Sequence, residues 1–392
     1  MKIARIRRWA VDFGFYNAIY VQIETEDGHI GESEVAMRRR TRSVLALIDE
    51  FADGLIGADA TQIERISERL YRDAFLGGTL LTIGISAIDQ ALWDLNARAL
   101  GVPVHRMLGG TFRDSVPLYT HAAAGSSPED FAARVKMRVD AGFKAIKSTL
   151  PGAYEKVTSV RDDEARRLIP THHTETEILP PWIWSYIGEY FAAAREAVGD
   201  DVHLLLDCHG RLNVSNSIRL AQALEPSKLT FIEEPVPYER PDWLREVARA
   251  STTPIAAGER WGNHMASDPF IEVGGVAVAQ PDVGICGGIT AARKIATLAE
   301  TRGVSIAFHN PFGPLQSAAT WHLAASIPNL LLSESMITPE QHPYWTRYVE
   351  DAPVVTGGRW TPTETPGLGP RLNIEALEAG EPALVLDMGG TR

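Results

Sequence analysis

The chain has little cysteine and no long apolar run. Cys208 and Cys286 are the only cysteines among its 392 residues, so the sequence offers no disulfide framework and favours a reducing compartment. No stretch approaches the roughly 20 consecutive apolar residues that cross a bilayer. The N-terminal residues also lack the long apolar core of a signal peptide. We therefore expect a cytoplasmic protein with no membrane segment.

Basic residues are also in short supply. The chain carries 38 Lys and Arg residues against 50 Asp and Glu residues, for a formal net charge of −12. This acidic balance argues against a general affinity for nucleic acid or anionic membranes, although a small anionic substrate would respond only to the local field of its pocket. With 45% hydrophobic and 22% charged residues, the rest of the composition is that of an ordinary globular protein.

The order of apolar patterns predicts two parts. Residues 1–34 read as strands joined by a turn, and residues 41–100 have the periodicity of helices, which together suggest a separate α+β domain. Beyond residue 115, eight short apolar runs alternate with helix-like segments. Such alternation is typical of a buried parallel sheet, and eight units favour a closed barrel. A doubly wound open sheet is the alternative, but no glycine-rich phosphate loop follows any of the runs.

A polar side chain ends each of the last six runs. In chain order these are Asp207, Glu233 with Glu234, Glu259, Asp282, His309 and Glu334. Successive positions are 23 to 27 residues apart, which is one strand–helix unit each. Because the active sites of such barrels lie at the carboxyl ends of the strands, we expect these side chains to meet at one mouth.

Three of the carboxylates suggest a metal site. Asp207, Glu233 and Glu259 would end three adjacent strands and converge in one cavity. Converging carboxylates repel one another, and burying them without a counter-charge is costly. An all-oxygen ligand set with no thiolate favours a hard divalent cation, so the pattern predicts Mg²⁺.

A second pair of side chains lies across the mouth from this cluster. Asp282 and His309 would end the next two strands, side by side. An aspartate bonded to one ring nitrogen of a histidine fixes the tautomer and raises the basicity of the other nitrogen. The pair is therefore expected to act as a general base opposite the metal.

The residues at these strand ends resemble those of the enolase superfamily, mandelate racemase subgroup. The resemblance rests on "DCHGR", "FIEEP", "AAGER", "QPDVGICGGIT", "HNPFGP" and "SES", in that order, and on the earlier "SAIDQALWDLNARALGVPVHRMLGG". It covers nearly the whole chain. It implies a modified TIM barrel, (β/α)7β, over residues 114–340 and an α+β capping domain over residues 1–113, which the segment 341–392 packs against and completes.

The resemblance also implies a reaction. One Mg²⁺ per subunit would be held by the three carboxylates described above, and His309, oriented by Asp282, would remove the proton α to a substrate carboxylate. Glu334 would hydrogen-bond the enolate oxygen that the metal does not fully serve. A carbon acid of this kind is very weak, so only a cation and fixed donors at that oxygen make its enolate accessible.

One difference between this chain and the subgroup reduces the number of candidate reactions. Many members carry a Lys-x-Lys pair at the end of the second strand, with the second lysine as a further base, whereas this chain has Lys147 and then Thr149. In exchange, His209 stands two residues after Asp207, in a stretch similar to the "Asp-x-His-Gly-Arg" of the acid-sugar dehydratases of the D-galactonate dehydratase type. There the histidine protonates the departing β-hydroxyl.

The resemblance thus implies Mg²⁺-dependent dehydration of a sugar acid to a 2-keto-3-deoxy acid. The substrate would be an aldonate such as galactonate, gluconate or mannonate, and Lys147 would neutralise its carboxylate. An epimerase or cycloisomerase that uses the same enolate, with His309 and either Lys147 or His209, is one alternative. A low-activity member of the family that only binds a sugar acid is the other. We expect a small-molecule partner, no nucleic acid or membrane partner, and a homo-oligomer.

Several of these residues have a second interpretation. His209 could simply bond its neighbouring carboxylate, and Lys147 could be a solvated lysine at a strand end. His121, at the end of the first barrel strand, either contacts the substrate or ends the strand without a function. In the long connection at 151–185, the adjacent histidines at 172 and 173 are expected to be plain loop residues. Tyr16 belongs to a capping loop that could meet the far end of the substrate.

Overall fold

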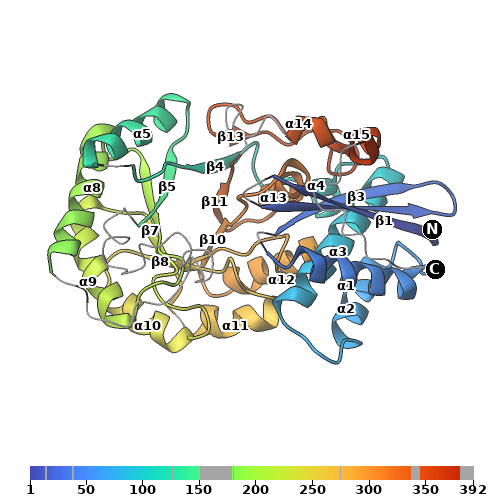
Figure 1. Cartoon of the computed structure of the whole chain (residues 1–392), viewed down its shortest axis with the longest axis horizontal. Coiled ribbons are helices and arrows are strands. Elements are labelled where there is room, and N and C mark those ends of the chain that lie inside the picture. The colour runs from blue at the N-terminus through green and yellow to red at the C-terminus, as the bar shows by residue number, and fades with distance from the viewer. Residues whose placement is uncertain are drawn as a thin grey trace.

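The N-terminal part of the chain is an antiparallel sheet covered by helices (Figure 1). The computed structural model describes residues 1–13, 16–37, 39–125, 127–150, 179, 181–273, 275–336 and 345–379. The sheet contains, in order, β1 (Ile3–Asp12), β2 (Asn17–Thr25) and β3 (Ile30–Met37). Three helices follow, namely α1 (Thr41–Leu55), α2 (Ile63–Arg72) and α3 (Thr79–Ala99). These elements share a hydrophobic core, which confirms the predicted α+β cap.

Helix α3 joins the cap to the rest of the molecule. It is buried along most of its length, because it packs on β3 and also on α12 (Gly288–Glu300). The backbone of β3 comes so close at Gly31 that a Cβ there would overlap the carbonyl oxygen of Ala91 in α3, so only glycine fits. On the other side, Nε1 of Trp93 donates a hydrogen bond to Oγ1 of Thr290 in α12 at 2.9 Å.

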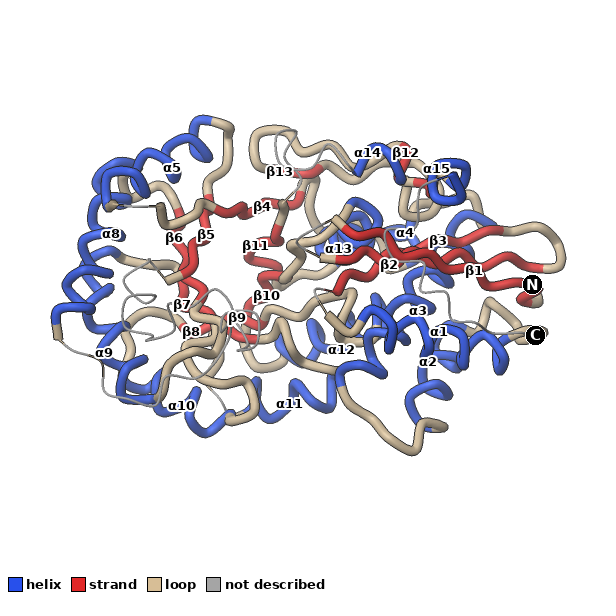
Figure 2. The backbone as a smooth tube through the Cα atoms, viewed as in Figure 1, coloured by secondary structure: helices blue, strands red, loops and turns tan. Residues whose placement is uncertain are grey.

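Eight parallel strands close into a barrel (Figure 2). Around the barrel they are β4 (Val116–His121), β5 (Ala145–Thr149), β6 (His203–Asp207), β7 (Phe231–Glu233), β8 (Ile255–Ala257), β9 (Val278–Ala279), β10 (Ser305–Phe308) and β11 (Leu330–Glu334). Strand β11 pairs back with β4, so the doubly wound alternative is excluded. One apolar residue of each strand fills the interior, in a cluster of Tyr119, Ala145, Leu205, Phe231, Ala256, Val278, Ala307 and Leu332. The polar strand ends therefore lie above a packed core.

Within the described residues, a helix follows each of the first seven barrel strands. These are α5 (Pro128–Asp140), α8 (Trp182–Val198), α9 (Val214–Leu224), α10 (Pro241–Ala250), α11 (His264–Glu272), α12 and α13 (Pro314–Ser326). Side-chain caps start several of them: Oγ of Ser127 accepts from the backbone N–H of Asp130 in α5, and Oδ1 of Asn213 accepts from that of Asn216 in α9. The arrangement confirms the predicted (β/α)7β barrel.

The C-terminal segment runs from the barrel back to the cap. Its elements are α14 (Trp345–Tyr348), β12 (Val349–Glu350), β13 (Arg359–Trp360), β14 (Arg371–Leu372) and α15 (Ile374–Ala379). Strand β13 pairs antiparallel with β4 of the barrel. The backbone N–H of Leu368 donates to Oδ1 of Asp94 in α3 at 2.7 Å, and that of Leu372 donates to Oε2 of Glu32 in β3 at 2.9 Å. Two buried carboxylates of the cap thus hold this segment, as predicted.

Two further sequence predictions concern membrane segments and the long connection at 151–185. In the part that the structure describes, no helix combines the length and the apolar character that a membrane crossing requires. The histidine pair at 172 and 173, and most of the long connection at 151–185, lie outside the described residues. Their predicted roles therefore stay predictions.

Two buried histidines meet where α4 (Val104–Met107), α13 and the C-terminal segment come together. Nδ1 of His105 lies 3.1 Å from Nδ1 of His322, and Nε2 of His322 lies 3.2 Å from the carbonyl oxygen of Leu368. The ring of Trp360 packs edge-on against His322, with centroids 5.2 Å apart. Burial lowers the pKa of His322 to about 3, and the nearby His105 contributes to the decrease, so His322 is neutral near pH 7.

The variant His322→Gln should make the fold less sensitive to acid. The unfolded chain protonates His322 below its ordinary pKa of 6.5, whereas the folded chain does so only near about 3, so the free energy of unfolding falls as the pH falls through this interval. At about pH 5 the loss from this one group is about 2 kcal/mol. The variant should be less stable than the wild type at about pH 8, yet lose about 2 kcal/mol less on going to about pH 5.

Urea unfolding at both pH values measures this difference. The partly exposed His29, exchanged to glutamine, is the matched control and should keep the acid sensitivity of the wild type. Equal acid sensitivity in His322→Gln and the wild type would contradict the prediction.

Candidate active site

The strand ends bring three carboxylates to one point of the barrel mouth. Asp207 and Glu233 are register partners on β6 and β7, and each stands two residues beyond an interior residue, so both side chains face inward. Glu259 follows the end of β8, the next strand around the barrel. One oxygen of each carboxylate lies within 4.8 Å of the other two, and all three residues are buried. The predicted cluster is present.

The buried charge of this cluster suits a cation. Glu233 is fully buried, and its Oε1 has no hydrogen-bond partner among the described residues. Burial raises the pKa of Glu259 well above its ordinary value, and the charges of Asp207 and Glu233 raise it further. A bound divalent cation relieves both the repulsion and the orphaned oxygen, and all-oxygen ligands suit Mg²⁺. The residues present therefore fit the predicted metal.

Lys147 is a counter-charge that the chain itself supplies. Its side chain is 1% exposed, so it is not a solvated strand end. The distances from its Nζ are 2.9 Å to Oε2 of Glu233, 3.2 Å to Oε1 of Glu334 and 3.8 Å to Oδ2 of Asp207. Burial lowers the pKa of Lys147, but Glu233 and Glu334 outweigh burial and hold it well above its ordinary value. A protonated Lys147 thus links the cluster to Glu334, and its contact with a substrate carboxylate stays a prediction.

His309 and Asp282 lie together at the ends of neighbouring strands. Nδ1 of His309 lies 2.6 Å from Oδ2 of Asp282, and Nε2 faces the cluster, 3.2 Å from Oε2 of Glu259. Burial lowers the pKa of His309, but Glu334 and the bond to Asp282 outweigh it, so that the pKa lies above its ordinary value. An imidazole that is oriented through Nδ1 and basic at Nε2 can take a proton from a molecule held at the cluster.

Glu334 lies between Lys147 and the loop that follows His309. It is fully buried, accepts a hydrogen bond from the backbone N–H of Asn310 at 2.7 Å, and forms an ion pair with His121, which faces the mouth. Burial raises the pKa of Glu334, but Lys147, His309 and His121 lower it well below its ordinary value. An ionised Glu334 can only accept hydrogen bonds, so it must be protonated before it can donate one to an enolate oxygen, as predicted. The negative charge of a nearby enolate would raise the pKa of Glu334 and so favour this protonation.

His209 contacts another part of the cluster. Its Nε2 lies 2.9 Å from Oδ2 of Asp207, and its backbone N–H donates to Oδ1 of the same carboxylate at 2.8 Å. A left-handed turn, with φ of 52° at His209 and 66° at Gly210, brings the ring back onto Asp207. His209 and His309 thus contact two different carboxylates of the cluster, Asp207 and Glu259. The bond to Asp207 also suits a structural histidine, so geometry alone leaves both interpretations of His209 open.

Sequence reasoning missed two residues that support the site. Nη2 of Arg260 lies 2.9 Å from Oε1 of Glu259, and its Nη1 contacts Glu234, so this guanidinium offsets negative charge at the outer side of the cluster. Its position directly after Glu259 was an available signal. Nε2 of Gln316 donates to Oδ1 of Asp282 at 2.9 Å, and nothing in the sequence around Gln316 marks it.

The cap reaches the site through aromatic rings. The ring of Tyr16 lies 5.3 Å from that of Phe312, which in turn lies 6.1 Å from the ring of His309. Tyr16 is 2% exposed in this position. It therefore packs against Phe312, and its predicted contact with the far end of a substrate stays a prediction.

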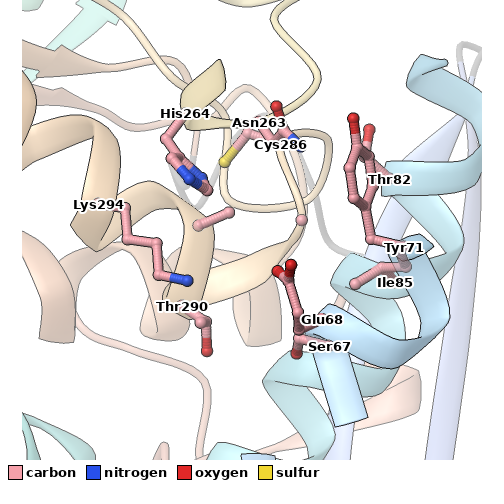
Figure 3. Close-up of a pocket in the computed structure, with 12 residues that line it drawn as sticks. Ser67, Glu68, Tyr71, Thr82, Ile85, Asn263, His264, Cys286, Thr290 and Lys294 are labelled. Atoms are coloured by element: carbon pink, nitrogen blue, oxygen red, sulfur yellow. The ribbon is translucent and has the colours of Figure 1, made fainter. Parts of the chain in front are cut away.

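A second cavity lies between the cap and the barrel, away from the carboxylates (Figure 3). Glu68 and Tyr71 of α2 face His264 and Lys294 of the barrel helices across it. Its volume of about 40 Å³ has room for a few water molecules and too little for a sugar acid. Within the described residues, its lining includes none of the predicted site residues.

Comparisons with known families cover most of the chain. Residues 130–377 match the family described as Enolase C-terminal domain-like. Residues 15–109 match the family described as Mandelate racemase / muconate lactonizing enzyme, N-terminal domain. The first range includes most of the barrel and its C-terminal segment, and the second includes most of the cap.

Similar proteins include two D-galactonate dehydratases. The one from Pectobacterium atrosepticum is 35% identical over 92% of this chain and 90% of its own length, and the one from Ralstonia nicotianae is 35% identical over 94% and 91%. Among solved structures, a member of the enolase superfamily from Salmonella Typhimurium has a TM-score of 0.87 at 26% identity, over 96% of this chain and 98% of that one. An enolase structure from Agrobacterium radiobacter, with bound sodium and L-malate, has a TM-score of 0.82 at 28% identity, over 96% and 94%.

The variant Glu259→Gln should separate the two effects of the clustered carboxylates on stability, which are mutual repulsion without metal and Mg²⁺ binding with it. Without metal it has one repelling carboxylate fewer, so it should unfold less readily than the metal-free wild type. With Mg²⁺ at about 100 times its dissociation constant, the wild type should gain about 2.7 kcal/mol in free energy of unfolding, whereas the variant should gain little. Denaturant unfolding with EDTA and with Mg²⁺ measures both effects. The exposed Glu239, exchanged to glutamine, is the control, and a full Mg²⁺ response in Glu259→Gln would rule Glu259 out as a ligand.

Proposed function

Because the chain belongs to the mandelate racemase and muconate lactonizing enzyme family of the enolase superfamily, and is an acid-sugar dehydratase within it, we propose that it converts an aldonate to a 2-keto-3-deoxy acid. Galactonate, gluconate and mannonate are the candidate substrates. The observation that carries the proposal is that His209 and His309 contact two different carboxylates of the same carboxylate cluster. The likeness to two D-galactonate dehydratases supports the same substrate class.

The cluster would bind the carboxylate end of the substrate. Asp207, Glu233 and Glu259 would hold Mg²⁺, and Lys147 adds a positive charge at the same place. When bound, the metal supplies Lewis-acid stabilisation of the negative charge that develops on the substrate carboxylate. The protein's own part is to hold donors and charges there without reorganisation.

His309 would begin the reaction. Its Nε2 takes the proton from C2 while Asp282 holds the Nδ1–H, so the ring carries the proton as an imidazolium paired with a carboxylate. The electron pair of the broken C2–H bond moves into the C1–C2 bond and gives an enolate. Lys147 and, once protonated, Glu334 are the groups placed to donate to its oxygens.

His209 would complete the elimination. It donates a proton to the hydroxyl on C3, the C3–O bond breaks with its electron pair on the oxygen, and water leaves. The enolate electron pair forms the C2–C3 double bond, and the carboxylate at C1 is restored. The resulting enol exchanges its O–H proton for a proton at C3 and becomes the 2-keto-3-deoxy acid.

An epimerase or cycloisomerase remains the second candidate, because the same enolate serves it. One observation speaks against Lys147 as its further base. Lys147 is enclosed by three carboxylates, each within 3.8 Å of its Nζ, which favours the protonated ammonium. His209 would then be the only other proton carrier among the residues predicted for the site.

The wild type, incubated with Mg²⁺ in D₂O with a panel of four- to six-carbon sugar acids, should convert one of them to a 2-keto-3-deoxy acid. The variant His309→Asn should lower that rate by about 10²- to 10⁴-fold, the usual contribution of a general base. Proton NMR follows both the loss of the C2 proton and the signal of the single proton that remains at C3, where the other hydrogen comes from D₂O. Chelation of Mg²⁺ with EDTA is the control and should stop turnover. Deuterium at C2 without loss of water would instead establish an isomerase.

The variant His209→Asn should uncouple the two halves of the reaction. His309 is intact, so exchange of the C2 proton with D₂O should continue, whereas the loss of water should slow by about 10²- to 10⁴-fold without its general acid. The same NMR experiment measures both rates, and calorimetric titration measures Mg²⁺ affinity as the control. If exchange, elimination and Mg²⁺ affinity fell together, His209 would be a structural partner of Asp207 and not the acid.

The remaining sequence predictions concern the surroundings of the enzyme. A cytoplasmic location and a homo-oligomeric state stay predictions. A small sugar acid as the partner agrees with the buried, charge-lined cluster, whose three carboxylates and one lysine suit a cation and a small anion together.

A further inference from the structure

The two oxygens of Asp282 have different partners. Oδ2 lies 2.6 Å from Nδ1 of His309, whereas Oδ1 accepts from Nε2 of Gln316 at 2.9 Å and from the backbone N–H of Gly284 at 2.7 Å. Asp282 and Gln316 are both fully buried, so water does not replace these partners. The bonds at Oδ1 set the plane of the carboxylate, and that plane sets the direction of the His309 ring.

Close packing fixes the amide of Gln316. A Cβ at Gly284 would overlap Oε1 of Gln316, so the glycine leaves room for this side chain and no larger residue fits beside it. The amide must present Nε2 to Asp282, because an ionised carboxylate accepts hydrogen bonds and cannot donate them. Both the position and the orientation of Gln316 are therefore determined by its surroundings.

The cap holds the helix turn from which Gln316 extends. Glu34 on β3 is fully buried and accepts from the backbone N–H of Leu315, the residue before Gln316, at 3.0 Å. Gly313 leaves room for that carboxylate, since a Cβ there would overlap Oε1 of Glu34. The free N–H groups that begin a helix, here α13, need acceptor oxygens, and Glu34 supplies one while burial raises the pKa of its carboxyl group to about 8. A residue of the cap thus seats the first turn of a barrel helix.

We propose that Gln316 is a positioning residue for the base His309, acting through Asp282, and that Glu34 fixes the helix turn that presents it. This inference rests on the proposed function, in which His309 takes the proton from C2. Gln316 would affect the chemical step and not substrate binding, because its Nε2 donates to Asp282 and not to the carboxylate cluster that would bind the metal.

Two variants test this role by different routes. Gln316→Met removes the donor at similar size, whereas Gly284→Ala leaves Gln316 intact and pushes its amide away. On the Mg²⁺-loaded enzyme, both should lower kcat by about 10- to 100-fold, the usual effect of removing an outer partner of a reacting group, with KM nearly unchanged. The control is Gln90→Met, which removes another buried amide, one that donates to the carbonyl oxygen of Ser86 at 3.1 Å. It should cost stability and leave kcat unchanged.

A double variant separates positioning from general damage. If Gln316 acts only through the base, adding Gln316→Met to His309→Asn should cause no further loss of activity. Losses that multiply would overturn the inference. The inference would also be overturned if the wild type dehydrated a sugar acid and Gln316→Met had the same kcat. In that case the proposed function would stand, and the positioning role of Gln316 would not.

A measurement without substrate keeps the inference testable on its own. The proton in the 2.6 Å bond between His309 and Asp282 should give a proton NMR signal far downfield, identified by its absence in His309→Asn. Gln316→Met should shift or broaden this signal, and Gln90→Met should leave it in place. An unchanged signal in Gln316→Met would overturn the inference. If no sugar acid in the panel reacted but the signal shifted as expected, the proposed function would fail and the positioning role would stand.

Discussion

The burial of three carboxylates at one point is the constraint on which the rest of the structure depends. Asp207, Glu233 and Glu259 could not be stable together in the barrel mouth without positive charge nearby. The fold supplies Lys147 on the inner side of the cluster and Arg260 on the outer side, and leaves Oε1 of Glu233 for a cation. The carboxylates that would bind a metal therefore also require positively charged side chains, here Lys147 and Arg260, at their sides.

In the part of the chain that the structure describes, the cap contacts α13 and Phe312, which lie next to the predicted base His309. It places Glu34 at the start of α13 and Tyr16 against Phe312, whose ring in turn contacts that of His309. The proposed positioning of His309 would therefore depend partly on the cap, whose strand β3 packs so closely on α3 that Gly31 has no room for a side chain.

Much of the site was predictable because a barrel repeats one unit. Each strand is buried on both faces, so its apolar run is visible in the sequence, and its polar end returns at a regular interval. The surroundings of Lys147 were not predictable, because they depend on how neighbouring strands are staggered around the barrel. Gln316 and Glu34 were not predictable either. Glu34 and Leu315 are 281 positions apart, and they meet only because the cap docks on α13.

In the proposed mechanism, the positions of the proton carriers suit elimination better than racemisation. A two-base racemase needs a second base facing C2, and the position at which the family resemblance would place that lysine is Thr149, the register partner of Asp207. The lysine that is present, Lys147, is held by carboxylates and favours its charged form. In the proposed reaction the second proton carrier is instead His209, which contacts Asp207. In that reaction, the ring of His209 would give its proton to the leaving hydroxyl on C3.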